Sequence, residues 1–271
     1  MKLSDLGELG LLAELERRGL ARGIESDAAE LFGGLVVTQD ALVEGVHFRR
    51  DLLSWRELGF RAAAVNLSDL AASGATPEAL IVTLAAPAET ELGDVLELYE
   101  GLGEAGVPVA GGDTTAASQV MVSVTAIGRS ERVPGRGGAK PGDRIVVSGP
   151  LGGAGAAFRN GTLARPPIRL EEGRRLAREA HAMLDVSDGL ARDAAHIAAR
   201  SGCRVVIDLG RVPLAAGATI DDLGFGEDYE LLAAVADAAG FAEIGRCEEG
   251  SGVELLLEGK PVELPGYEHF S

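Results

Sequence analysis

The residues of this chain best suited to chemistry are aspartates in short polar motifs. Each stands beside Gly, Ser, Thr or Asn, or at the end of an apolar run: Asp27, Asp40, Asp69, Asp113, Asp185 and Asp188. A single aspartate in such a place is usually a turn or helix cap with an exposed carboxylate. Several together, without His or Cys partners, are the hard oxygen ligands that Mg²⁺ prefers. We therefore expect exposed carboxylates that bind magnesium and, through it, a polyphosphate.

Glycine motifs of the common nucleotide-binding folds are absent or wrongly spaced. The segment IVVSGPLGGAGAAF (145–158) places glycines between an expected strand and an expected helix, but their spacing does not match GxGxxG. We interpret it as a tight strand-to-helix turn and not as a nicotinamide site. The absence of GxxxxGK[ST] excludes a P-loop kinase, and the HRD and DFG motifs of protein kinases are absent too.

Composition narrows the class of protein. The 271 residues suit one large domain or two ordinary ones, and 46% apolar with 25% charged residues is globular. A net charge of −17 disfavours nucleic acid and anionic membranes as partners. No apolar run approaches the ~20 residues that span a bilayer, and the acidic, amphipathic start does not resemble a signal peptide. Cys203 and Cys247 lack metal or disulfide spacing, so we expect reduced core thiols in a cytoplasmic protein.

Periodicity and capping residues predict alternating helices and strands in both halves of the chain. The expected helices are 5–20, 54–73 (capped by Ser54 and Glu57), 90–105 (capped by Thr90), 169–180 and 188–201. The expected strands are 35–38, 79–85, 119–128, 143–149 and 203–209. VPVAGGDTT is predicted to be a short strand entering a glycine turn, and FGEDYELLAAV to run from a turn into a strand or a helix. A connector rich in Gly, Pro and Arg over 129–143 predicts two α/β domains, 1–138 and 139–271.

Taken in order, these motifs resemble the thiamine-monophosphate kinase family, part of a larger group with aminoimidazole ribonucleotide synthetase, selenophosphate synthetase and the hydrogenase-maturation dehydratase. The resembling segments span nearly the whole chain: VTQDALVEGVHF, AAAVNLSDLAASGATPEAL, PVAGGDTT, RGGAKPGD, RPPIR, LDVSDGLARD, GEDYEL and GYEHF. VEGVHF, GEDYEL and GYEHF are fairly specific to the kinase, whereas NLSDLAA and GGDTT are shared with the wider group. The resemblance implies a two-domain, aminoimidazole ribonucleotide synthetase-like α/β (α+β) fold. Its N-terminal domain would bind ATP and magnesium and close a β-barrel in a homodimer, and its C-terminal α/β domain would lie on the substrate side.

The resemblance also implies a reaction, the phosphorylation of thiamine monophosphate to thiamine diphosphate by ATP and several Mg²⁺ ions. Positions matching the family's metal ligands are Asp27, Thr38, Gln39, Asp40, Asp69, Asp113, Asp185 and Asp188, with Gln39 acting through its backbone. Positions matching nucleotide contacts are Asp27, Tyr99, Gly112, Asp113, Arg136 and Ser187. Positions matching contacts to thiamine phosphate are His47, Glu227 and Tyr267. Because the acceptor is already an anionic phosphate oxygen, we expect direct in-line transfer without a catalytic base or a covalent phospho-enzyme.

One motif departs from the family pattern, and other interpretations stay open. The family's GDDAA is ESDAA here, so Ser26 replaces an aspartate and Glu25 replaces a glycine. The metal site at Asp27 is then weaker, or Glu25 compensates. An enzyme of the same fold with another acceptor is one alternative, and a non-catalytic nucleotide or thiamine-phosphate sensor is another. Taken without the resemblance, His47 could be a half-buried strand-end histidine, Tyr267 a packing anchor and Arg136 a linker charge.

Overall fold

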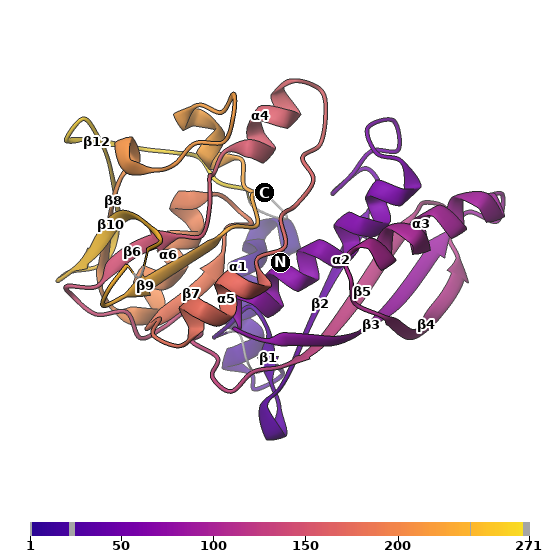
Figure 1. Ribbon diagram of the computed structural model, residues 1–271, viewed down its shortest axis with the longest axis horizontal. Coiled ribbons are helices and arrows are strands. Elements are labelled where there is room, and N and C mark those ends of the chain that lie inside the picture. The colour runs from indigo at the N-terminus through magenta and orange to yellow at the C-terminus, as the bar shows by residue number, and fades with distance from the viewer. Residues whose placement is uncertain (1, 22–24, 239, 268–271) are drawn as a thin grey trace.

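Two β-sheets, one in each half of the chain, form the framework of the protein (Figure 1). The computed structural model describes residues 2–21, 25–238 and 240–267. The expected two-part α/β architecture is confirmed, and no helix within these ranges is long and apolar enough to cross a membrane.

The first half is a five-stranded sheet covered on one face by two helices (Figure 1). The strand order is β1-β2-β5-β3-β4, antiparallel except for the parallel pair β3 and β4. The elements are α1 (Leu3–Arg17), β1 (Ala29–Glu30), the 3₁₀ turn η1 (Phe32–Gly34), β2 (Leu35–Val43), α2 (Trp55–Ala72), β3 (Thr76–Ala86), α3 (Leu92–Glu104), β4 (Val109–Ala116) and β5 (Met121–Arg129). The sheet is open, and all but the first of the eight β4 residues are exposed at its edge.

Helix α2 begins where its sequence predicts, and α3 does not. The Ser54 side chain accepts from the Glu57 N–H, and the Glu57 carboxylate accepts from the Ser54 N–H, which is the expected capping box. The N-cap of α3 is Glu91 and not Thr90, and the Glu91 side chain makes no capping bond; Thr90 instead belongs to a turn in which its N–H donates to the Pro87 carbonyl. The two helices then cross in near backbone contact, since a Cβ on Gly101 would lie 1.9 Å from the Arg56 carbonyl oxygen.

The second half is a seven-stranded sheet of order β12-β11-β8-β10-β6-β9-β7, with helices on both faces. Its elements are β6 (Arg144–Val147), α4 (Gly153–Arg159), α5 (Leu170–Ala177), β7 (Ala182–Asp185), α6 (Leu190–Ser201), β8 (Arg204–Asp208), η2 (Leu209–Arg211), η3 (Ile220–Gly224), β9 (Leu231–Val235), β10 (Ala242–Glu248), β11 (Gly252–Leu257) and β12 (Lys260–Val262). Successive side chains alternate between the two faces: Val147 and Leu232 pack with α6, and Val146 and Leu231 pack with α5. The GEDYEL segment therefore leads into a strand, β9.

The C-terminal end of α2 is shared by the two halves. Ala71 and Ala72 belong to a core cluster with Leu176 of α5 and Met183 of β7. A Cβ on Gly173 would lie 2.2 Å from the Ala71 carbonyl oxygen, so α5 packs directly on the α2 backbone. This contact holds the part of α2 that carries Asp69, two residues before Ala71, against the second half.

The prediction of a glycine turn at GGDTT is wrong. Strand β4 runs without a break through Gly112 and Asp113, in parallel register with β3. A Cβ on Gly112 would lie 1.8 Å from the Val82 carbonyl oxygen. Glycine is therefore needed here for the close approach of two strands. In the sequence, a glycine needed for this reason cannot be distinguished from a glycine in a turn.

Candidate active site

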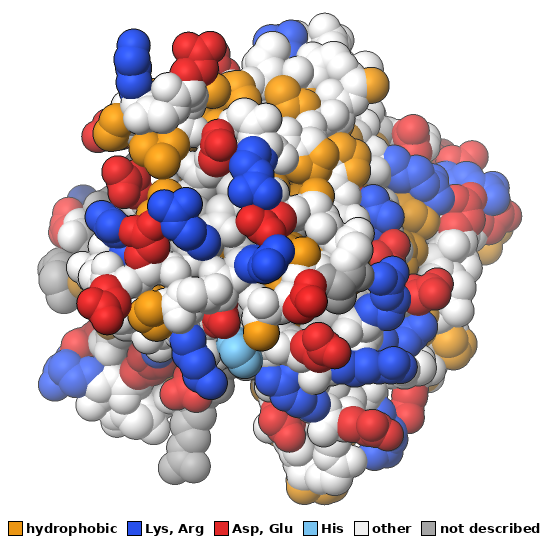
Figure 2. All heavy atoms as spheres, turned by 60° about the vertical axis from the view of Figure 1, so that its left-hand side comes forward, with side chains coloured by type: hydrophobic (Ala, Val, Ile, Leu, Met, Phe, Trp, Pro, Cys, Tyr) orange, Lys and Arg blue, Asp and Glu red, His pale blue; other side chains and the backbone are white. Residues whose placement is uncertain are grey.

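A cavity of about 1390 Å³ lies between the two halves and gathers most of the expected site residues. The expected residues that line it are Asp27, Thr38, Gln39, Asp40, His47, Asp69, Arg136, Asp185, Ser187, Asp188, Glu227 and Tyr267. It exceeds the roughly 300–1,000 Å³ of a typical small-molecule pocket, so it has room for two substrates. Acidic and basic side chains are interspersed on the face shown in Figure 2, so the net negative charge does not collect on that face.

Three carboxylates from different parts of the chain come together in the wall of the cavity. Asp27 precedes β1, Asp69 lies on α2, and Asp185 ends β7. One carboxylate oxygen from each lies within 4.8 Å of the other two. The first two residues come from the half with the five-stranded sheet and the third from the other half, so the cluster exists only because the halves pack together.

Hydroxyl and backbone donors fix the orientation of these carboxylates. The Thr38 hydroxyl donates to Asp69 Oδ2 at 2.5 Å, and the Ser68 hydroxyl donates to Asp185 Oδ2 at 2.5 Å. The Asp185 N–H donates to Asp27 Oδ2 at 3.2 Å, which joins the two halves directly. Each bond leaves other carboxylate lone pairs facing the cavity, where a cation can be bound.

Arg136 supplies the positive charge nearest the cluster. Its Nε and Nη2 both lie 2.7 Å from Asp27 Oδ1, and its N–H donates to the Glu25 carbonyl. One guanidinium faces three carboxylates, so the cluster keeps a negative charge when all three are ionised. The Glu25 side chain is exposed and does not line the cavity, and the Ser26 hydroxyl donates to the Ala28 carbonyl.

Burial and mutual repulsion raise the pKa of the clustered carboxyls. Burial, followed by the charge of Asp27, raises the pKa of Asp185 to about 8. The same two causes raise the pKa of neighbouring Asp40 to about 6. Burial and the charges of Asp40 and Asp185 raise the pKa of Asp69 well above its usual range. The ionised forms of these groups are therefore unfavourable together unless a cation joins them.

The expectation that turn contexts expose these carboxylates is wrong for the residues that matter most. The Asp27 side chain is 2% exposed and Asp185 is 6% exposed. Asp69 lies on a helix whose flanking residues Ser68 and Leu70 are buried. Packing of one half on the other buries these positions. A local sequence pattern carries no information about that contact between distant segments.

A second polar group lies along α6. Asp188, Asp193 and His196 each offer one ligand atom, and these atoms lie within 4.8 Å of one another. Asp193 Oδ2 accepts from the Asp188 N–H at 3.0 Å, which orders the start of the helix. Burial, followed by the charges of Arg136 and Arg192, lowers the pKa of His196 to about 4, so its ring is neutral at pH 7.

His47, Glu227 and Tyr267 line the cavity from separate segments. His47 Nδ1 accepts from the Val43 N–H at 3.0 Å, so in the neutral ring the proton is on Nε2. Glu227 has φ +57° and lies 2.7 Å from Arg61 Nη2, a cation that is 2% exposed. Tyr267 is 45% exposed, and its N–H donates to the Asp188 carbonyl. The last three residues of the GYEHF motif, 268–270, lie outside the described residues.

Three of the expected residues lie away from the cavity. Tyr99, on α3, is partly buried against the N-terminal core, and Gly112 and Asp113 lie on edge strand β4. Strand register places Gly112 level with Asp40, three strands away. That separation is about 14 Å at the usual strand spacing. The Gln39 side chain, for its part, is bound to the Ser123 hydroxyl on β5.

Several residues that shape the site carried weaker sequence signals. Asn66 accepts from the Asp40 N–H at 3.0 Å, and Ser68 contacts Asp185. Both residues are polar positions inside the otherwise apolar AAAVNLSDLAA segment. That pattern could have indicated that they belong to the site. Asp193 and His196, three apart on a helix, share one face and could have been recognised in the same way.

Comparison with known proteins places this arrangement among relatives. Residues 25–130 match the model of the AIR synthase related protein, N-terminal domain, and residues 140–257 match that of its C-terminal domain. A thiamine-monophosphate kinase of Aquifex aeolicus is 33% identical over 309 residues, covering 100% of both chains. One from Mycobacterium tuberculosis is 35% identical, covering 98% of this chain and 91% of its own.

Solved structures show the same similarity. AaThiL complexed with AMPPCP and TMP superposes with a TM-score of 0.91 at 32% identity, covering 99% of each chain. Hydrogenase maturation protein HypE in complex with ATP superposes with a TM-score of 0.73 at 19% identity, which shows a shared fold.

The raised pKa values predict how the metal-free protein responds to pH. The pKa of Asp185 is about 8 in the folded state against an ordinary 3.8. The folded protein therefore binds more protons than the unfolded chain between these values, and its stability falls as pH rises. Asp185→Asn removes this charge while keeping an acceptor for Ser68. At pH 8 without metal, the variant should melt roughly 3–6 °C above the parent protein.

Differential scanning calorimetry in EDTA at pH 5 and pH 8 measures this effect. The difference should shrink at pH 5, where Asp185 of the parent protein is protonated. Glu97→Gln removes an exposed carboxylate that does not line the cavity, and it should change neither midpoint. An Asp185→Asn protein that melts below the parent at pH 8 would show that the cluster is not under electrostatic strain.

Proposed function

This chain belongs to the thiamine-monophosphate kinase family, and we propose that it transfers the γ-phosphoryl group of ATP to the phosphate of thiamine monophosphate. The observation that carries the proposal is the cluster of Asp27, Asp69 and Asp185 in the wall of a cavity large enough for both substrates. AaThiL, whose fold this chain shares over 99% of its length, was solved with an ATP analogue and TMP.

The donor set of the cluster fits magnesium. Its ligand atoms are carboxylate oxygens with the Thr38 and Ser68 hydroxyls beside them, and oxygen ligands suit Mg²⁺ better than transition metals. Burial, followed by neighbouring carboxylates, raises the pKa of Asp69 and Asp185, so a bound cation would stabilise their ionised forms. We propose that Asp27, Asp40, Asp69 and Asp185 hold several Mg²⁺ ions, which would neutralise the triphosphate and the charge that develops during transfer.

The remaining residues of the cavity would position the two substrates. Arg136, held by Asp27, would bind phosphate oxygens through its guanidinium, as would Ser187 from the loop after β7. His47 Nε2–H, Glu227 and Tyr267 would contact thiamine monophosphate. The acceptor oxygen is anionic at neutral pH, so no residue needs to remove a proton. Alignment of donor and acceptor then supplies most of the catalysis.

The exposed edge of the first sheet supports a homodimer. Strand β4 is the last strand of its sheet, and no strand among the described residues pairs with its outer edge; such edges pair readily with another strand. We propose that two copies join their five-stranded sheets into a closed barrel. Tyr99, Gly112 and Asp113 would then complete the site of the partner copy. We also propose that the enzyme acts in the cytoplasm, without nucleic acid or membrane as partners.

A direct assay tests the proposed reaction. The purified protein with ATP, MgCl₂ and thiamine monophosphate should yield thiamine diphosphate and ADP in equal amounts, resolved by liquid chromatography. Asp69→Asn should lower kcat by at least about a hundredfold, because the metal ligand is lost while the Thr38 hydroxyl keeps an acceptor. Its far-ultraviolet circular dichroism should match that of the parent protein.

Other outcomes of the assay separate the competing functions. Binding of thiamine monophosphate without any product would favour a sensor. Neither binding nor product would favour another acceptor. Near-normal turnover by Asp69→Asn at saturating magnesium would remove the cluster from the mechanism.

The dimer proposal predicts complementation between two inactive variants. Asp113→Asn and Asp69→Asn should each be inactive as homodimers. After mixing and subunit exchange, a heterodimer keeps one site with both residues intact, because Asp113 acts in the partner's site. Activity should recover to about a quarter of the parent's, from half of the dimers with one working site each. No recovery, with exchange verified by native mass spectrometry, would show that Asp113 and Asp69 act in the site of the same subunit and would contradict the proposed barrel.

A further inference from the structure

Two stacked phenylalanine rings lie on the wall of the cavity. Phe158, on α4, and Phe225, just after η3, stack with ring centroids 5.0 Å apart and an interplanar angle of 30°. Both line the cavity that contains the carboxylate cluster. Phe158 is 52% exposed, so one face of the stack is open to a ligand. A single exposed phenylalanine is ordinary, but a stacked pair inside a substrate cavity calls for a reason.

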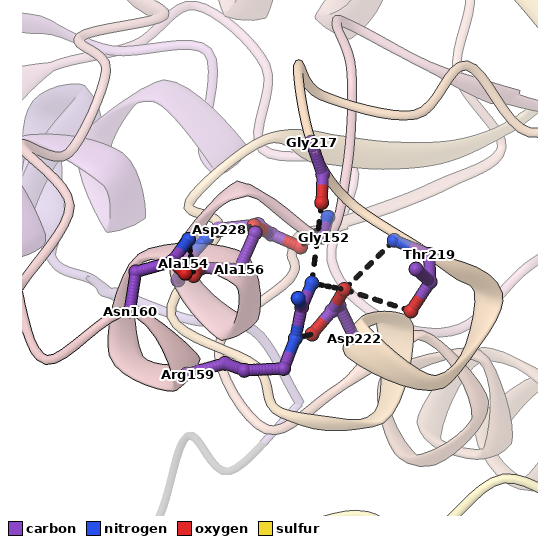
Figure 3. Close-up of polar contacts among 9 residues, drawn as sticks. All are labelled: Gly152, Ala154, Ala156, Arg159, Asn160, Gly217, Thr219, Asp222 and Asp228. Carbon is purple, nitrogen blue, oxygen red and sulfur yellow. Dashed lines mark hydrogen bonds and ion pairs between the residues drawn. The ribbon is translucent and has the colours of Figure 1, made fainter.

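The start of α4 is fixed by Asp228 of the GEDYEL segment. Asp228 Oδ2 accepts from the Gly152 N–H at 2.6 Å, and Oδ1 accepts from the Ala154 N–H at 3.1 Å (Figure 3). A buried carboxylate here satisfies N–H groups that the first turn of a helix leaves free. Asp228 therefore serves to anchor α4, and it does not line the cavity.

The far end of α4 is fixed by Arg159, the residue after Phe158. Its Nη2 lies 2.7 Å from Asp222 Oδ2 and donates to the Gly217 carbonyl at 3.1 Å (Figure 3). The Asp222 carboxylate also accepts from the Thr219 N–H and hydroxyl. These bonds balance the charge of Arg159, so the cation beside the aromatic pair is already neutralised.

Close packing keeps α4 against η3. A Cβ on Gly155 would lie 2.9 Å from the Asp222 carbonyl oxygen and 3.0 Å from Cβ of Phe225. The helix therefore contacts the backbone of the segment that carries the second ring. With both ends bound and its middle packed, α4 presents the Phe158 ring in a fixed orientation. A preformed wall of this kind binds a flat ligand with little loss of conformational freedom.

We propose that Phe158 and Phe225 form the wall on which the heteroaromatic part of the acceptor stacks, and that Phe158 determines specificity for a ring-bearing phosphate. This inference rests on the proposed function, because thiamine monophosphate carries a pyrimidine and a cationic thiazolium ring. Aromatic faces attract both flat rings and cations. Asp221, exposed and lining the same cavity, adds a negative charge that suits a cationic ring.

Steady-state kinetics of Phe158 variants test the wall. Phe158→Ala should raise the KM for thiamine monophosphate about tenfold, the scale of one lost stacking contact. The KM for ATP and kcat should change by less than about twofold, because the ring contacts only the acceptor. Phe158→Tyr keeps the aromatic face and should restore the parent KM, whereas Phe158→Leu keeps apolar bulk and should stay impaired. A merely structural role would move both KM values and kcat together.

Phe241→Leu serves as the control. It changes an aromatic ring that contacts Arg175 and does not line the cavity, so it should leave both KM values unchanged. An unchanged acceptor KM in Phe158→Ala, or full rescue by Phe158→Leu, overturns the aromatic wall and leaves the kinase function standing. If calorimetry shows that the parent protein binds thiamine monophosphate but the assay shows no product, only the proposed kinase reaction is contradicted. The wall is then judged by the affinity of Phe158→Ala for that compound. No binding by the parent overturns both.

Discussion

Repulsion among Asp27, Asp69 and Asp185 is the constraint around which this molecule is built. Three buried carboxylates share a space of less than 5 Å, and Arg136 balances only one of their charges. Burying such a group is costly unless a cation joins it. The packing of the two halves, with α5 seated on the backbone of α2 at Gly173, is what forces the carboxylates together. These carboxylates therefore make the metal-free folded protein less stable. Binding of a metal-bound polyphosphate at the cluster would restore that stability.

The GEDYEL segment shows how the scaffold serves this site, because its three acidic residues have three different tasks. Glu227 faces the cavity from a left-handed backbone position and pairs with buried Arg61 on α2. Asp228 anchors the start of α4, and with it the Phe158 ring. Glu230 is buried and binds Arg169 of the RPPIR segment through two nitrogens. One short motif therefore joins a cavity-lining residue to α2 of the first half, through Glu227, and anchors α4 and Arg169 within the second half.

Local signals in the sequence predicted the parts that depend on local physics. The capping box of Ser54 and Glu57 fixed the start of α2, and apolar runs located most strands. The polar motifs selected Asp27, Asp69 and Asp185, which do converge. What could not be predicted depends on contacts between distant segments. Burial of those carboxylates follows from the packing of the halves. The glycines around Gly112 predict a turn, but Gly112 instead permits the close approach of two strands. The position of Asp113 on the outer edge of the sheet follows from the strand order.

The central claim is that carboxylates from both halves jointly bind the metal that phosphoryl transfer needs. Anomalous diffraction from crystals grown with Mn²⁺ and a non-hydrolysable ATP analogue tests it most directly. We expect at least one anomalous peak within bonding distance, about 2.2 Å, of oxygens from Asp69 and Asp185 together. Peaks confined to surface carboxylates, with ordered analogue in the cavity and none between Asp27, Asp69 and Asp185, would contradict it.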